Sequence, residues 1–344
     1  MRTIRFALMG FGNVGKAFAK LLIRKHEEIR SLYDCDVIIT AVTTNSKGNI
    51  YKPEGIHLQL ILDDLESAGR FSPARCTEKS SMEILETGEY DCVVELSPLN
   101  IHTGQPATDY IRTAMERGRH AITANKGPIA WHYRELKELA EARGIGFYHE
   151  TVVMDGTPVF NLAEHTLKMT KITRVEGILN TTTNYILEEM AKGIAMDEIM
   201  ARGREMGFVE ADPAMDIEGY DAAAKVTALL NVLMDADITP DMVHRKGIED
   251  ITYDDVRDAA SRGKKIKLLC RGFRDAEGKV TAIVGPEEVD MTDMYASISG
   301  TTSVVSITTD LMKKISIIEH DPEIEQTAYG VYGDMLRVIK EILG

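Results

Sequence analysis

The first 150 residues alternate short apolar runs with amphipathic stretches, a pattern that predicts strands and helices in turn. The apolar runs are rich in β-branched residues and lack polar alternation, as expected of strands that are buried on both faces of a sheet. Predicted strands cover residues 4–9, 36–43, 91–96 and 120–124, and predicted helices cover 107–117 and 133–143. Elements in this order require right-handed crossovers, so we expect a parallel sheet with its ligands at the carboxyl ends of the strands.

The pattern changes near residue 156. Strands are predicted over 173–179, 281–284 and 298–308, with long helices between them, including one over 187–206 whose methionines are expected in the core. A last amphipathic helix covers 327–343. We expect residues 1–150, with 311–344 packed back on them, to form one domain, and residues 151–310 to form a second, α+β domain.

The most informative motif follows the first strand, where Gly10-Phe11-Gly12-Asn13-Val14-Gly15 opens an amphipathic helix. The three glycines of such a loop allow a tight turn, a close approach of the backbone to a pyrophosphate, and close packing of the helix on the strand. The amide groups and positive dipole end of the helix favour phosphates. We interpret these six residues as cofactor contacts and expect an α/β fold in which a Rossmann-type dinucleotide-binding domain is joined to the α+β domain.

The end of the second strand helps to choose between the two nicotinamide cofactors. An NAD-binding domain usually places Asp or Glu there to bind the ribose hydroxyls. This chain has Thr-Thr-Asn-Ser-Lys at 43–47 instead, so no carboxylate would repel a 2′-phosphate, and Thr43 and Lys47 are candidates to bind it. We expect NADP, with NAD as the alternative. Ser97 and Lys126 each follow another strand and are expected at the same crevice.

Composition narrows the classes of partner. The chain has 344 residues, and its 54 acidic and 40 basic residues give a formal charge of −14, which argues against nucleic acid or an anionic membrane as a partner. No apolar run reaches membrane-spanning length, and the 4 cysteines form no C-x-x-C pair, so neither a zinc site nor a disulfide framework is indicated. A reducing cytoplasm fits these features.

A run of carboxylates in the second half is the main candidate for chemistry. Acidic residues are concentrated between Glu210 and Asp221, just before an alanine-rich helix. Asp221 and Lys225 are four residues apart and share a helical face. An exposed ion pair of this kind would contribute only a few tenths of a kcal/mol to the free energy of unfolding. The apolar flanks instead place Lys225 half-buried beside carboxylates, a setting that suits proton transfer.

Taken together, these motifs resemble homoserine dehydrogenases along most of the chain. The matching segments are residues 10–15, 94–98, 123–128, 154–159, 177–187 and 210–225. The resemblance implies NAD(P)-dependent, reversible reduction of L-aspartate 4-semialdehyde to L-homoserine, a step in threonine, methionine and isoleucine biosynthesis. It also implies that the α+β domain is catalytic and forms a homodimer, and we expect residues 298–308 to leave an apolar sheet face for that contact.

The resemblance further implies roles for single residues. Lys225 is the acid that protonates the aldehyde oxygen, and the base in the reverse direction. Lys126 lies near the nicotinamide and the substrate. Glu210 and Asp221 accept hydrogen bonds from the substrate ammonium and orient Lys225, with Asp216 behind them.

A second site implied by the resemblance is a loop that holds a monovalent cation, expected to be sodium. Its residues in this chain are Glu150, Val153, Asp155 and Thr157. A carboxylate and several backbone carbonyls provide the oxygen ligands that hard cations prefer. The alternative is a plain turn around residues 155–156.

Two departures from the family pattern affect these expectations. Residues 319–326 contain four carboxylates and no glycine, where relatives have a glycine-rich turn near the cofactor, and the chain ends without a regulatory extension. We therefore expect a short form that threonine does not inhibit. Two rival functions are an aspartate-semialdehyde dehydrogenase, which needs a reactive cysteine, and a nucleotide-binding sensor without catalysis. Cys92 and Cys270 lie in apolar segments, which argues against the first rival.

Overall fold

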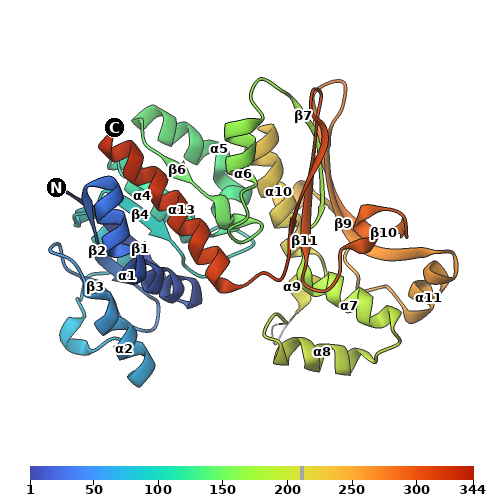
Figure 1. Ribbon diagram of the computed structural model, residues 1–344, viewed down its shortest axis with the longest axis horizontal. Helices are drawn as coiled ribbons and strands as arrows, with labels where there is room; N and C mark the ends of the chain where they lie inside the picture. The colour runs from blue at the N-terminus through green and yellow to red at the C-terminus, as the bar shows by residue number, and fades with distance from the viewer. Residues whose placement is uncertain (210–212) are drawn as a thin grey trace. The chain divides into compact units, whose positions relative to one another are not determined.

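The computed structural model describes residues 1–209 and 213–344 (Figure 1). The chain forms two compact units. The first unit comprises Met1–Pro158 and Glu323–Gly344, and the second unit comprises Val159–Pro322. The second unit extends past residue 310 because β12 (Lys313–Glu319) pairs with β11 (Ser303–Thr309) in its sheet. Residues 311–322 therefore belong to the second unit and residues 151–158 to the first unit, contrary to the expectation from the sequence in both cases.

A six-stranded sheet in the order β3-β2-β1-β4-β5-β6 forms the centre of the first unit. All neighbouring pairs are parallel except β2 with the short β3. This arrangement confirms the predicted Rossmann-type α/β fold. The strands are β1 (Arg2–Met9), β2 (Cys35–Thr43), β3 (Ile50–Tyr51), β4 (Cys92–Glu95), β5 (His120–Thr123) and β6 (Phe147–Tyr148).

Helices cover both faces of this sheet because its strands are apolar on both sides. On one face, Phe6 of β1 packs with Phe18 of α1 and Met335 of α13, and these two helices run side by side (Figure 1). On the other face, Met9 packs in a second cluster with Leu136 of α5. The helices are α1 (Asn13–Tyr33), α2 (Leu58–Ala68), α3 (Ser81–Thr87), α4 (Ala107–Glu116), α5 (Lys126–Arg143) and α13 (Ile324–Leu343), with short 3₁₀ turns at Pro73–Arg75 and Glu150–Val152.

The second unit contains another six-stranded sheet, in the order β12-β11-β7-β9-β10-β8. Its neighbouring strands are antiparallel, apart from the two-residue pairing of β8 with β10. This sheet and its helices confirm the predicted α+β architecture. The remaining strands are β7 (Ile172–Ile178), β8 (His244–Arg245), β9 (Lys264–Arg274) and β10 (Val280–Asp290).

Helix α10 (Tyr220–Met234) packs closely on this sheet. Most of its residues are buried, and a Cβ atom at Gly272 of β9 would lie 2.2 Å from Leu230, so the glycine leaves room for the helix. The alanine-rich sequence thus forms an internal helix rather than an exposed one. The other helices of the unit are α6 (Phe160–Thr166), α7 (Thr181–Ala191), α8 (Met196–Glu205), α9 (Ala214–Ile217), α11 (Tyr253–Ser261) and α12 (Met294–Ser297), with a 3₁₀ turn at Pro240–Met242.

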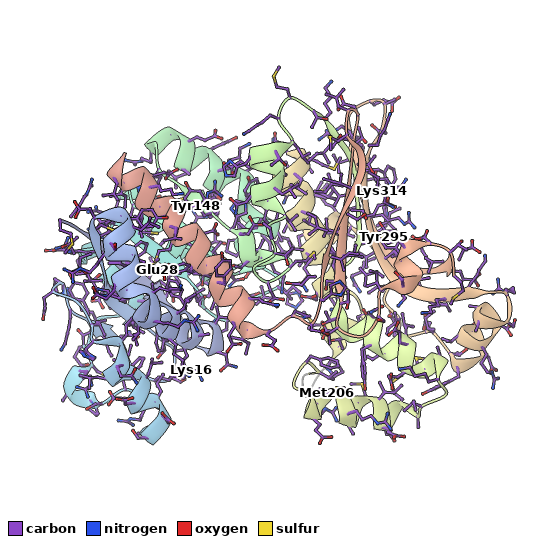
Figure 2. All side chains as sticks on the ribbon, viewed as in Figure 1. Lys16, Glu28, Tyr148, Met206, Tyr295 and Lys314 are labelled. Carbon is purple, nitrogen blue, oxygen red and sulfur yellow. The ribbon has the colours of Figure 1, made fainter. Side chains whose placement is uncertain are left out.

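The single helix predicted over 187–206 is two helices. Gly193, with a φ of +77°, follows α7 and turns the chain before α8 begins. Met190 is buried, but Met206 is 57% exposed and its side chain projects from the end of α8 (Figure 2). The prediction that the methionines of this segment form a core stripe is therefore wrong for Met206 and also for the exposed Met196.

The strand predicted over 298–308 begins only at Ser303. Its apolar residues do not form an open face, because Val304, Val305 and Ile307 are fully buried within the second unit. Val304 packs in a small cluster with Tyr295 of α12, and Lys314 of β12 lies 4.8 Å from the ring of Tyr295 (Figure 2). The expected uncovered sheet face is therefore absent from this strand.

Within residues 1–209 and 213–344, no helix is both long and apolar enough to span a bilayer.

Candidate active site

The glycine loop after β1 has the geometry that its sequence predicts. Gly10 has a φ of +107°, and a Cβ atom there would lie 2.3 Å from the Leu96 carbonyl oxygen, so only glycine fits. A Cβ at Gly15 would lie 3.1 Å from the Gly10 carbonyl oxygen, since α1 packs close to the strand end. At Gly12 the same atom would meet nothing within 4 Å. The backbone at Gly12 therefore faces open space, as the approach of a ligand requires.

A cavity of about 270 Å³ lies beside this loop, at the carboxyl ends of β1, β2 and β4. None of the described residues that line it is Asp or Glu. The expected cofactor residues Asn13 and Val14 lie just beyond it in the first turn of α1, which begins without a side-chain cap. Six of the expected cofactor residues line the cavity, namely Gly10, Phe11, Gly12, Thr43, Lys47 and Ser97.

Lys47 is folded onto the glycine loop. Its Nζ donates a hydrogen bond to the Phe11 carbonyl at 3.0 Å, and burial, with the nearby charge of Lys16, lowers the pKa of Lys47. Lys47 thus contributes a cationic side chain to the lining of the cavity. Thr43 contributes only to the cavity wall, because its buried hydroxyl donates to the Met9 sulfur at 3.4 Å.

Glu95, the last residue of β4, is a buried carboxylate that sequence reasoning did not single out. One carboxylate oxygen accepts hydrogen bonds from the Ser97 hydroxyl and, at 2.7 Å, from the Ser97 amide. The other accepts from the Thr123 hydroxyl at 2.9 Å. Burial raises the pKa of Glu95 to about 7, although the hydrogen bonds from Ser97 and Thr123 act in the opposite direction. The only signal in the sequence was a glutamate within a β-branched run.

Asn125 extends this network to the start of α5. Its side-chain carbonyl accepts the Gly127 amide hydrogen bond at 3.0 Å and so caps the helix, and its Nδ2 donates to the Ser97 carbonyl at 3.3 Å. Lys126 is consequently the first residue of α5 rather than a loop residue. It does not line the cavity beside the glycine loop.

In the second unit, Lys225 projects from α10 into a cluster of acceptors. Its Nζ lies 3.2 Å from Asp221 Oδ2 and donates to the Leu179 carbonyl oxygen at 2.8 Å. The side chains of Lys225 and Asp221 are 19% and 14% exposed. The partly buried lysine expected from the apolar flanks is thus observed.

Asn180 links this pair to a second carboxylate. Its Nδ2 donates to Asp216 Oδ1 at 2.6 Å and to Asp221 Oδ2 at 3.0 Å. Burial raises the pKa of Asp216, and the charge of Asp221 adds to this effect, while Asn180 and Lys225 oppose it. The structure therefore brings together three of the expected residues, Lys225, Asp216 and Asp221. The fourth, Glu210, lies outside the described residues.

This cluster contains a positioned ammonium group and partly buried carboxylates. An ammonium held by a carboxylate and a carbonyl can donate a proton to an oxygen placed beside it. Partly buried carboxylates can also accept hydrogen bonds from a ligand ammonium, since the surrounding apolar helix excludes water and strengthens charge pairing.

The expected cation loop packs on α13 within the first unit. Glu150 is buried and its amide donates to Asp334 Oδ2 at 2.9 Å, while Asp155, with a φ of +40°, accepts from the Thr327 hydroxyl. The Thr157 amide donates to the Met154 carbonyl at 2.8 Å. Val153 is buried in the same loop. In the part of the chain that the structure describes, no three His, Cys, Asp or Glu side chains form a metal cluster, so a cation here would depend on backbone carbonyls.

The three buried cysteines do not have the surroundings of a nucleophile. Cys35, Cys92 and Cys270 are buried, and burial raises the pKa of each thiol, that of Cys270 to about 12. Cys76 is the one partly exposed cysteine, and like the other three it forms no disulfide bond. An activated thiolate, which an aspartate-semialdehyde dehydrogenase requires, is not favoured at the three buried cysteines.

Comparison with known proteins gives consistent matches along the chain. The family described as "Homoserine dehydrogenase, NAD binding domain" matches residues 10–150, and the family described as "Homoserine dehydrogenase" matches residues 158–336. An "NAD(+)-dependent homoserine dehydrogenase" of Pseudomonas canavaninivorans is 33% identical, with 98% of this chain and 97% of the relative covered. A homoserine dehydrogenase of Methanocaldococcus jannaschii is 35% identical over 96% of this chain and 97% of its own length. The crystal structure of a homoserine dehydrogenase from Thiobacillus denitrificans is similar with a TM-score of 0.82 at 29% identity, covering 99% of this chain and 74% of that one.

Proposed function

The chain belongs to the homoserine dehydrogenase family, and from this premise we propose that Lys225 is the proton donor of its reaction. The enzyme reversibly reduces L-aspartate 4-semialdehyde to L-homoserine. When bound, the nicotinamide cofactor supplies a hydride for the aldehyde carbon. Lys225 gives a proton to the aldehyde oxygen, and in the reverse direction it takes the proton from the homoserine hydroxyl.

The observation that carries this assignment is the contact of Lys225 with Asp221 and the Leu179 carbonyl. These acceptors hold the ammonium in one place, as a positioned general acid requires. The negative charges of Asp221, Asp216 and Glu210 attract the substrate ammonium. We further propose that Lys126, the first residue of α5, lies beside the nicotinamide.

Absorbance at 340 nm tests the reaction directly. The purified protein with L-homoserine and either NADP or NAD should produce the reduced cofactor, and the rate should depend on both components. A protein that binds the cofactor but gives no homoserine-dependent change would be a nucleotide sensor instead.

For cofactor preference, we propose NADP over NAD. The support is the cavity beside the glycine loop, where Lys47 provides a cation and no described lining residue is acidic. The Pseudomonas canavaninivorans relative, however, is named NAD(+)-dependent, so the choice needs a measurement. The ratio of kcat/KM for the two cofactors should favour NADP, and a tenfold preference for NAD would contradict the proposal.

We also propose that the loop of Glu150, Val153, Asp155 and Thr157 binds sodium in a structural role. The donor set fits a hard cation, because the loop combines the buried carboxylate of Glu150 with its own backbone carbonyls, and the Glu150 amide is held by Asp334 of α13. Sodium chloride should raise the melting temperature more than an equal concentration of choline chloride, and the effect should saturate. Identical melting curves in the two salts would show that the loop binds no sodium and is a plain turn.

The enzyme is proposed to act as a homodimer in the cytoplasm. All 4 cysteines are free, which suits a reducing compartment. Support for dimerisation through the second unit comes from the family and from β12, an edge strand that carries the partly exposed Ile318 and follows the exposed Leu311 and Met312. Light scattering at micromolar concentration should give a dimer mass, and Ile318→Glu should weaken it. A monomer for the wild-type protein would contradict the proposal.

A further inference from the structure

We propose that Asn180 is a positioning residue for this reaction, because its side-chain amide holds Asp216 and Asp221 together and so fixes Asp221 against Lys225. The inference rests on the proposed role of Lys225 as the proton donor. It concerns a residue that lies at the start of α7 and that does not itself transfer a proton.

The hydrogen bonds of Asn180 fix the orientation of its amide. The side-chain oxygen accepts from the Thr183 amide at 2.8 Å and from the Thr183 hydroxyl at 2.9 Å. The amide nitrogen donates to Asp216 at 2.6 Å and to Asp221 at 3.0 Å. A flipped amide would turn an oxygen toward two carboxylates and an NH₂ group toward an N–H donor, so only the observed orientation is stable.

A neutral donor is well suited to this place. Asp216 and Asp221 repel one another, and both lie in partly buried surroundings where repulsion is strong. The two N–H bonds of Asn180 reduce that repulsion, one on each carboxylate. A lysine or arginine would do the same, but its charge would compete with Lys225 for Asp221 and with the substrate ammonium for both carboxylates.

The neighbouring peptide group supports the other side of Lys225. The Leu179 carbonyl accepts from Lys225 Nζ at 2.8 Å, while Asn180 holds Asp221, which lies 3.2 Å from the same nitrogen. The turn between β7 and α7 thus acts on Lys225 in two ways: its Leu179 carbonyl bonds to the ammonium directly, and its Asn180 side chain holds Asp221, which contacts the same ammonium. Asn180 is itself buried, so this arrangement is shielded from competing water.

Asn180 also caps α7, and the test must separate the two roles. Serine is as good a cap as asparagine, so Asn180→Ser keeps a capping oxygen but removes both donors to the carboxylates. Asn180→Asp keeps the cap and the shape but turns a third carboxylate toward the other two. Thr252→Ala removes a capping side chain from α11, elsewhere in the second unit, and serves as the control for cap loss alone.

Steady-state kinetics over a range of pH values, cofactor binding and melting temperature should be measured for these variants. Asn180→Ser is expected to lower kcat/KM for homoserine about ten- to a hundredfold, the usual effect of losing hydrogen bonds to charged groups. The hydrogen bond from Asn180 lowers the pKa of Asp216, so the acid limb of the profile should move to higher pH. Asn180→Asp should give a larger loss. NADPH affinity should change little in both variants, while the melting temperature should fall, and more for Asn180→Asp than for Asn180→Ser, because the buried carboxylates lose their shared donor.

Kinetics and pH profile within twofold of wild type for Asn180→Ser would overturn the positioning role. The positioning role would also be overturned if the pH profile of Asn180→Ser were unshifted and its activity fell only in proportion to the fraction of folded protein. An equal shift of the pH profile in Thr252→Ala would overturn it as well. The proposed reaction fails separately, if the wild-type protein does not oxidise homoserine or if Lys225→Met retains its turnover. In either of those cases the role of Asn180 falls with it.

Discussion

Each of the two units places a buried asparagine at the start of a helix and joins it to a network with carboxylates, but the charges differ. In the first unit, Asn125 caps α5 and reaches Ser97, which donates to Glu95. Within the described residues, Glu95 bonds only to neutral donors, and its pKa is raised to about 7. In the second unit, Asn180 joins two carboxylates, and Lys225 provides the opposite charge.

This difference matches the chemistry of the two ligands. A pyrophosphate is anionic, so a cavity without a described acidic lining residue, behind which Ser97 bonds to a carboxyl group that a proton can neutralise, avoids repelling it. An amino-acid substrate brings an ammonium and an oxygen that must gain a proton, so carboxylates beside a lysine are needed. The same local feature, an asparagine cap, therefore supports a network whose carboxyl group takes up a proton near pH 7 in one unit, and a network with a lysine counter-charge in the other.

The strongest test of the first unit's reliance on backbone geometry is Gly10→Ala. The added Cβ would clash with the Leu96 carbonyl oxygen at 2.3 Å and would occupy a φ of +107°. We expect a melting temperature lower by on the order of 5–10 °C and loss of NADPH binding.

Gly12→Ala is the matched control for Gly10→Ala. Its Cβ would meet no protein atom within 4 Å, so the melting temperature should hold while NADPH affinity falls. Equal stability losses in both variants, by calorimetry, would mean that the loop does not distinguish protein-facing from ligand-facing glycines.

The pH dependence of stability tests the neutral network. The folded-state pKa of Glu95 is about 7, against an ordinary value of 4.5, so the folded protein keeps a proton that the unfolded chain loses. Its contribution to the free energy of unfolding is full below pH 4.5 and falls by about 3 kcal/mol as the pH rises to 7. Glu95→Gln should lack this fall, measured as wild type minus variant by urea unfolding.

His149 changes the pH dependence of stability in the opposite direction to Glu95, so the effect of Glu95 must be measured as a difference between wild type and Glu95→Gln. Burial lowers the pKa of this residue to about 3, so the folded state keeps it neutral while the unfolded chain gains a proton below its ordinary pKa of 6.5. Its contribution therefore grows as the pH rises through the same window. A wild type minus Glu95→Gln difference that stays flat from pH 4.5 to 7 would show that Glu95 is charged in the folded protein.

A smaller effect is expected from Lys47→Ala. Loss of one cation at the proposed 2′-phosphate position should lower the NADP-to-NAD ratio of kcat/KM about tenfold. The exposed Lys20 lies on α1, away from the lining of the cavity, and Lys20→Ala should leave the ratio unchanged. An unchanged ratio in Lys47→Ala would remove this residue from cofactor selection.

The sequence predicted the first unit well because its signals are local. The glycine loop and the β-branched strands depend on neighbours within a few residues, and so does the Asp221–Lys225 spacing, which was the local signal of the second unit. Glu95 was missed because its burial depends on the packing of the whole sheet.

The second unit was harder to predict because its decisive contacts are distant. Asn180 reaches carboxylates that are 36 and 41 residues away, so its role could not be derived from its own segment. The division of 187–206 into α7 and α8 was missed because the apolar pattern continues past Gly193. The edge strand β12 was missed because only one of its sides is shielded: Ile315 and Ile317 are partly buried, whereas Lys314 and Ile318 on the other side are exposed.

The central claim is that the second unit transfers the proton while the first binds the cofactor, and Lys225→Met tests it most directly. Methionine nearly conserves the volume of lysine, so the melting temperature should stay within a few degrees. We predict that kcat falls at least about 100-fold, the lower limit for losing a positioned proton donor, while the Kd for NADPH changes less than about twofold. A variant that keeps more than about a tenth of wild-type kcat would show that Lys225 is not the acid.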